Sequence, residues 1–155
     1  MKVVQLLFLI TVLSVLFHQP LLAADQRFSV QADTSVLIDN ETGLMWPVQD
    51  NGSDISWPAG KEYCANFILA GFNDWRMPTQ DELATLYNLK AADSSDYYIM
   101  LKIKITACCL WAIDTNKAKV GSFDFEYGNR DWGYPMSTVD ARVLPVRSIA
   151  IQTEK

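Results

Sequence analysis

The most reactive side chains in the sequence are its three cysteines. Cys64 stands alone, whereas Cys108 and Cys109 are adjacent. In an oxidising compartment two of the three are expected to pair, which leaves one thiol over. A bridge from Cys64 to Cys108 or Cys109 would close a loop of about 45 residues and stabilise the fold by about 4 kcal/mol. A bridge between Cys108 and Cys109 is the less favoured alternative, because the backbone between neighbours must distort.

A second group of side chains that could bind a ligand lies late in the chain, where a tryptophan stands among polar residues in turns. Its flat ring could stack on a sugar while carboxylates and amides bind the sugar hydroxyls, and binding residues concentrate in such loops. The predicted ligand-binding residues are Asp124, Glu126, Asn129, Arg130, Asp131 and Trp132. The alternative is a solvated loop in which Trp132 is half-buried.

An oxygen-rich loop, Asp50-Asn51-Gly52 with Asp54, has the composition of a calcium loop. It lacks the longer alternating set of ligands and the closing glutamate of an EF-hand, so a solvated turn is the favoured interpretation. Calcium is kept as a secondary expectation. No other metal site, cofactor or catalytic residue is predicted.

The first 24 residues are typical of a secretory signal peptide. Lys2 precedes an apolar run from Val3 to Phe17, and Ala23-Ala24 is a suitable cleavage site. The run is shorter than the roughly 20 residues of a membrane span, although an uncleaved anchor is an alternative. Cleavage would remove His18, the only histidine. The mature chain would then have no Ser-His-Asp or Cys-His catalysis and no histidine metal ligand.

Charge and length limit the remaining function classes. The net charge of −5 argues against nucleic acid as the main partner. After cleavage about 130 residues remain, which is enough for one domain with its own core. We therefore expect a secreted or periplasmic bacterial protein with a single domain over residues 25–148 and a tail over 149–155. The oligomeric state is left open.

The segment from Gly71 to Thr79, called the corner here, connects two predicted helices and is expected to fix their relative positions. Thr79 and Glu82 have the spacing of a capping box, and Pro78 fixes the helix start. We expect Trp75 to pack in the core and Arg76 to pair with Asp74 or Glu82. The predicted structural motif comprises Gly71, Asp74, Trp75, Arg76, Pro78, Thr79 and Glu82.

Hydrophobic periodicity predicts an α+β fold. A short strand at 27–31 precedes a hairpin over 36–46, in which Gly43 supplies a positive φ and Trp46 packs in the core. Helices are expected at about 57–70 and 80–89, with Gly71 as the C′ residue of the first and Cys64 facing inward. Strands are expected at 99–106, 106–112, 118–125 and 139–146, with a turn at 127–131.

Four segments carry a family resemblance: Asp39–Trp46, Gly71–Leu83, Cys108–Asp114 and Ala141–Arg147. The second, Gly-Phe-Asn-Asp-Trp-Arg-Met-Pro-Thr-Gln-Asp-Glu-Leu, resembles the signature of the Lcl C-terminal-like domain family, named after the terminal domain of a bacterial collagen-like adhesin. Met77, Ile113 and Ser148 depart from the pattern, and Ser148 stands where many members have a cysteine. The resemblance implies a C-type-lectin-like fold, with two helices packed on a small, twisted, mostly antiparallel sheet.

The resemblance and the residues together favour a non-catalytic module for binding or adhesion outside the cytoplasm. Its expected partner is carbohydrate or another envelope or extracellular component. A structural subunit of an envelope assembly is an alternative. An enzyme related to formylglycine-generating enzymes is less favoured, because the apolar neighbours of Cys108-Cys109 indicate inert burial. The sugar-binding motifs of calcium lectins are absent from the sequence.

Overall fold

The computed structural model describes residues 27–31, 35–88, 97, 99, 103–113, 120–133, 138 and 140–149. The expected signal peptide, residues 1–24, and tail residues 150–155 lie outside this part of the chain. Within it, two helices and two antiparallel sheets confirm the α+β class, although the strands form two sheets instead of the single expected one. Neither helix has the length and apolar character that crossing a membrane requires.

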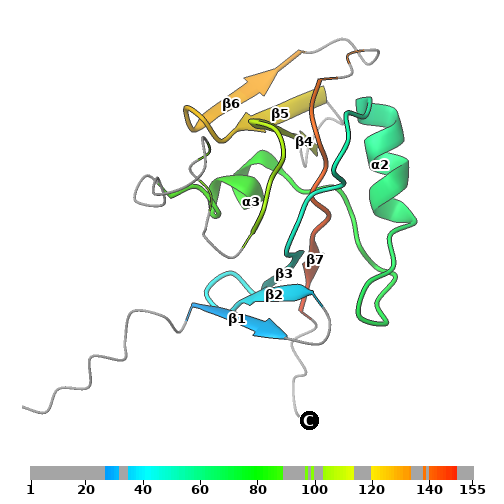
Figure 1. Ribbon diagram of the computed structural model, residues 1–155, viewed down its shortest axis with the longest axis vertical. Helices are drawn as coiled ribbons and strands as arrows, with labels where there is room; N and C mark the ends of the chain where they lie inside the picture. Colours follow the sequence, from blue (N-terminus) through cyan, green and yellow to red (C-terminus); the bar gives the residue numbers. More distant parts are fainter. Residues whose placement is uncertain are drawn as a thin grey trace, which may run out of the picture.

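The first sheet joins the start of the described chain to its end. Its strands are β1 (Phe28–Gln31), β2 (Val36–Asp39), β3 (Leu44–Pro47) and β7 (Arg147–Ser148), in the order β1-β2-β3-β7. The β2–β3 hairpin is confirmed, with Gly43 at φ +67°. Trp46 on β3 is fully buried, as predicted. In Figure 1 this sheet lies at the lower end of the molecule.

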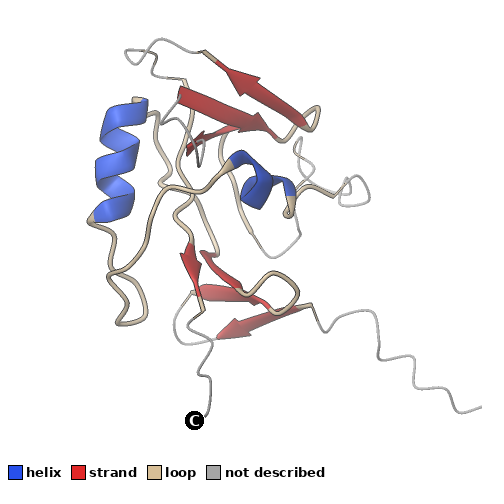
Figure 2. Ribbon diagram, turned by 180° about the vertical axis from the view of Figure 1, so that it is seen from behind, coloured by secondary structure: helices blue, strands red, loops and turns tan. Residues whose placement is uncertain are grey.

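The second sheet lies at the opposite end (Figure 2) and carries the predicted ligand-binding residues. It contains β4 (Cys109–Ile113), β5 (Val120–Asp124) and β6 (Asn129–Trp132) in that order. The predicted turn at 127–131 is wrong by about two residues, because the chain turns at 125–128 and Asn129–Trp132 pairs with β5. The expected central strand likewise begins at Cys109 and not at Thr106.

The first helix, α2 (Trp57–Ala65), ends about five residues earlier than predicted. Beyond it Phe67 turns inward and meets the Trp75 ring edge-on, with centroids 5.5 Å apart. Leu69 and Phe72 then exchange both backbone hydrogen bonds around Ala70 and Gly71, which have φ values of +55° and +78°. Gly71 thus belongs to a two-residue hairpin turn and not to a helix C-cap. Cys64 faces inward as predicted, but Ile68 is 71% exposed.

The second helix, α3 (Gln80–Ala84), has the predicted start and a shorter length. The Thr79 hydroxyl accepts a hydrogen bond from the Glu82 N–H at 3.1 Å, and the Glu82 carboxylate accepts one from the Thr79 N–H at 2.8 Å. After Ala84 the chain tightens into i→i+3 hydrogen bonds, including Leu86 N–H to Leu83 O at 2.9 Å. Leu83 and Leu86 are fully buried, so this segment keeps an apolar face toward the core even though the helix ends early.

Two predicted strands are not formed in the residues that the structure describes. Ile99, Ile103 and Ile105 are buried as the alternation predicts, but this segment contributes only single bridges, such as Lys104 with Gln49. In the last predicted strand, Ala141, Arg142 and Val146 each bridge a different segment, and regular pairing begins only at Arg147. The alternation of apolar residues therefore predicted correctly which side chains are buried. It did not predict which segments form hydrogen-bonded strand pairs.

Candidate functional site

The β5–β6 hairpin brings together all six predicted ligand-binding residues. Its turn is fixed by Asp124, whose Oδ1 accepts hydrogen bonds from the backbone N–H groups of Glu126 at 2.7 Å and Tyr127 at 3.2 Å. Gly128 closes the turn at φ +74°, against the ring of Tyr87. Because the turn is held by its own residues, it fixes the register of the strand that carries Trp132.

Strand alternation divides the six residues between the two faces of the hairpin. Trp132 pairs with Gly121 and Arg130 with Phe123, so Trp132 and Arg130 share one face. Asp124, Asn129 and Asp131 lie on the other face, and Glu126 is exposed in the turn. The six predicted residues therefore lie on one hairpin, but they are divided between two faces and cannot all contact one ligand.

The Trp132 side chain covers Gly121 and is 45% exposed. A Cβ atom at Gly121 would lie only 2.5 Å from Trp132 Cε3 and 2.6 Å from Cζ3, so the ring packs directly on the β5 backbone. The strand thus holds part of the ring, and close to half of the residue's surface is open to solvent. This is a supported aromatic platform, unlike a freely rotating surface side chain.

Charged groups flank this platform. Arg130 lies 5.9 Å from the Phe123 ring centroid and pairs with Asp81 on α3 at 3.0 Å. The Asp81 side chain is 89% exposed, which leaves it available to a ligand. Gln80, also on α3, donates to the carbonyls of Ser122 at 2.8 Å and Asp131 at 2.7 Å and ties the hairpin to the helix. Asp81 and Gln80 were not predicted, because their contacts with the hairpin span more than 40 residues.

The oxygen-rich loop that resembles a calcium loop is engaged within the protein. Asp50 is only 7% exposed and accepts hydrogen bonds from Thr106 N–H at 2.6 Å and Gly52 N–H at 2.9 Å. Asn51 Oδ1 accepts from Val143 N–H at 2.9 Å, and Asp54 pairs with Arg142. The interpretation of this loop as a solvated turn is therefore wrong at Asp50, whose carboxylate links it to later segments.

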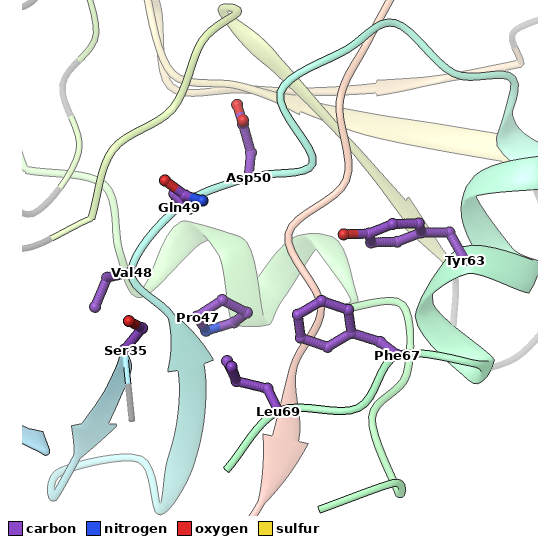
Figure 3. A pocket seen from close by; sticks show the side chains of 8 residues that line it. All are labelled: Ser35, Pro47, Val48, Gln49, Asp50, Tyr63, Phe67 and Leu69. Carbon is purple, nitrogen blue, oxygen red and sulfur yellow. The ribbon is translucent and has the colours of Figure 1, made fainter. Parts of the chain in front are cut away.

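A small pocket lies between β3 and the end of α2 (Figure 3). Its lining residues are Ser35, Pro47, Val48, Gln49, Asp50, Tyr63, Phe67 and Leu69, around a volume of about 100 Å³. Figure 3 shows the Tyr63 and Phe67 rings together on one side, while the Asp50 carboxylate points away from Phe67. Burial raises the pKa of Tyr63. Ligand pockets usually measure about 300–1,000 Å³, so this one is too small for a sugar and has room only for a few water molecules.

The cysteines pair differently from the favoured expectation. Cys108 and Cys109 form a disulfide, and Cys64 is a buried free thiol. The Cys64 thiol lies on α2 among the apolar side chains of Trp57, Met77 and Trp111, and this burial raises its pKa to about 12. The expected inert burial of Cys108-Cys109 is wrong as well, since both are only half-buried at the start of β4.

Comparison with models of known protein families shows the family of this chain. A family model described as the Lcl C-terminal domain matches residues 35–147. The chain belongs to this family. No curated protein matches the sequence.

In this Lcl C-terminal domain the motif around Trp75 contacts strand β7 through Asp74 and Arg147. Arg147 is 6% exposed, and its Nε and Nη2 donate to the two Asp74 oxygens at 2.7 and 3.1 Å. Its guanidinium lies 3.8 Å from the centroid of the Phe72 ring. The fork of arginine matches a carboxylate bidentately, so Asp74 and Arg147 lock the corner onto the first sheet. The hydrogen bond from Arg147 lowers the pKa of Asp74.

The other residues of the corner stabilise the start of α3. Trp75 is 3% exposed, as predicted for a core residue, and Pro78 is also buried. Arg76 pairs with Glu82 at 2.5 Å, which confirms the structural role predicted for it. Burial opposes ionisation of Glu82, but hydrogen bonds from Arg76 and the Thr79 N–H outweigh it and lower the Glu82 pKa. These contacts give the groups a structural role in the Lcl C-terminal domain.

Proposed function

We propose that this chain is an exported, non-catalytic binding or adhesion module whose platform is Trp132 on the β5–β6 hairpin. The observation that carries the proposal is the Trp132 ring, 45% exposed and supported from below by Gly121. A tryptophan fixed in this way offers a large contact area without having to be ordered on binding, which is the property of good interface anchors.

Carbohydrate is the partner class that the surroundings favour. A pyranose ring presents an apolar C–H face and a rim of hydroxyl groups, so it suits a flat aromatic ring beside charged hydrogen-bonding groups. Arg130 and Asp81 supply a donor fork and an exposed carboxylate next to the platform. The chain belongs to the Lcl C-terminal domain family, and the resemblance to that family implies a role in binding or adhesion.

A glycan array probed with residues 25–155 tests this proposal. We expect wild-type protein to bind a subset of glycans and Trp132→Ala to lose them. Ile68→Ala is the matched control, because Ile68 is an exposed apolar residue in the loop that follows α2, at the far end of that helix from β6 (Figure 1). Parallel arrays with calcium and with chelator test the secondary expectation of calcium. Binding that Trp132→Ala leaves unchanged would refute this platform.

The structural alternative predicts a different outcome. If the domain is a subunit of an envelope assembly, no glycan binds, and the Trp132 face instead cross-links to a protein neighbour in intact cells. A photo-cross-linker placed at Arg130 distinguishes the two, since a carbohydrate-binding face yields no single protein adduct.

A further inference from the structure

We propose that the reduced pair Cys108-Cys109, together with Asp124, forms a binding site for a thiophilic divalent cation of the Zn²⁺ class. One ligand atom from each of these residues, the two sulfurs and a carboxylate oxygen, lies within 4.8 Å of the others. In the part of the chain that the structure describes, this is the one group of three or more such side chains. It is independent of the Trp132 platform, because Asp124 lies on the opposite face of the hairpin.

The sheet itself creates this arrangement. Cys109 is paired directly with Asp124 across β4 and β5, and the Cys108 carbonyl accepts a hydrogen bond from Phe125 N–H at 2.7 Å. Asp124 Oδ1 is fixed by the N–H groups of Glu126 and Tyr127. The carboxylate therefore cannot turn away from the sulfurs without breaking the hairpin turn, so one of the three ligands is oriented before any metal arrives.

The donor set selects the metal. Two thiolates and one carboxylate give mixed sulfur and oxygen ligation, which favours zinc over calcium or magnesium. Zinc–sulfur bonds of about 2.3 Å at a tetrahedral angle place two sulfurs about 3.8 Å apart. All three residues are half-buried, so the fourth position can be taken by water or by an external ligand.

The disulfide and the metal site use the same sulfurs and exclude each other. A dithiol reductant converts the Cys108–Cys109 disulfide to two thiols by supplying two electrons and two protons, and is itself oxidised to a disulfide. Binding of the cation then displaces both thiol protons. The site is therefore open only in the reduced protein, and metal occupancy protects the thiols from reoxidation.

Anaerobic titration of the full domain with Zn²⁺ against a chromophoric chelator tests this inference, and Co²⁺ reports thiolate ligation through its charge-transfer absorption. We expect the reduced protein to bind one equivalent and the disulfide form to bind at least 100-fold more weakly. Cys108→Ser and Cys109→Ser should each remove tight binding. Asp124→Asn should weaken it about tenfold, because asparagine keeps the turn-fixing oxygen but loses the charge.

Cys64→Ser and Glu126→Gln are the matched controls, one for the buried thiol and one for an exposed carboxylate in the same turn. Both should bind Zn²⁺ as wild type does. Circular dichroism of each reduced protein verifies the fold before titration. Equal affinity in the reduced and disulfide forms, or loss of binding in Cys64→Ser alone, would overturn the assignment.

Discussion

The contact between Trp132 and Gly121 gives the sharpest prediction. A Cβ atom at Gly121 would lie 2.5 Å from Trp132 Cε3 and 3.0 Å from the carbonyl oxygen of Asp131. Carbon atoms ordinarily approach to about 3.5–4.0 Å, so Gly121→Ala must push the ring outward by about 1 Å or more. The ring can move because it is 45% exposed. The variant therefore displaces the proposed platform without removing any polar group from it.

The expected loss of stability in Gly121→Ala is the difference between two opposing effects. Overpacking costs about 1–3 kcal/mol, whereas replacing a strand glycine by alanine recovers about 0.5–1 kcal/mol of backbone entropy. The free energy of unfolding should therefore fall by up to about 2.5 kcal/mol, which lowers the Tm by a few degrees. Calorimetry measures this change, and binding of an array-selected glycan should weaken about tenfold.

Gly60→Ala is the matched control for the strain. A Cβ atom at Gly60 would lie 2.6 Å from Val143 Cγ1, in the packing between α2 and the later chain. We expect a comparable loss of stability and unchanged glycan binding. If Gly121→Ala had wild-type Tm and wild-type binding, the ring would not rest on Gly121. If both variants lost binding equally, general destabilisation would explain the effect, and the argument for the platform would fail.

Three further predictions concern the scaffold. Thr79→Ala should lower the free energy of unfolding by about 1 kcal/mol in urea titrations through loss of the cap, and an unchanged midpoint would contradict the capping box. Glu82 and Asp39 have lowered pKa values despite burial, because Arg76 and Arg27 donate hydrogen bonds to them, so they stay ionised when the unfolded chain takes up protons. Stability should therefore fall as the pH drops below about 4.5, and a flat profile between pH 6 and 3 would count against both pairs. Non-reducing peptide mapping should link Cys108 to Cys109 and find Cys64 unalkylated in native protein at pH 8, since its pKa is raised to about 12; a bridge from Cys64 would refute this pairing.

Features set by neighbouring residues could be predicted from the sequence. The capping box depends on two side chains three residues apart, and the β2–β3 hairpin depends on Gly43. Burial of Trp46 and Trp75 was also predicted, because a large apolar side chain is buried whatever partner covers it. The segment Gly71–Leu83, which resembles the family signature, includes both residues of this capping box.

Features set by distant partners could not be predicted. Arg147 pairs with Asp74 across 73 residues, and nothing in either segment indicates the other. Phe67, just beyond the end of α2, contacts Trp75, and the local sequence of the helix does not indicate this contact. The part of the candidate site on α3 was missed for the same reason, since Asp81 joins Arg130 only because α3 packs on β5. A signal was present at Gly121, where a glycine within a strand commonly marks a close approach by another group.

The most direct test of the account compares the affinity of one array-selected glycan for wild type, Trp132→Ala and Ile68→Ala by isothermal titration calorimetry. Removing the supported ring should raise the Kd at least tenfold, which corresponds to about 1.4 kcal/mol, while Ile68→Ala should leave it unchanged. Equal Kd values for wild type and Trp132→Ala would contradict the claim that this surface is where the domain binds.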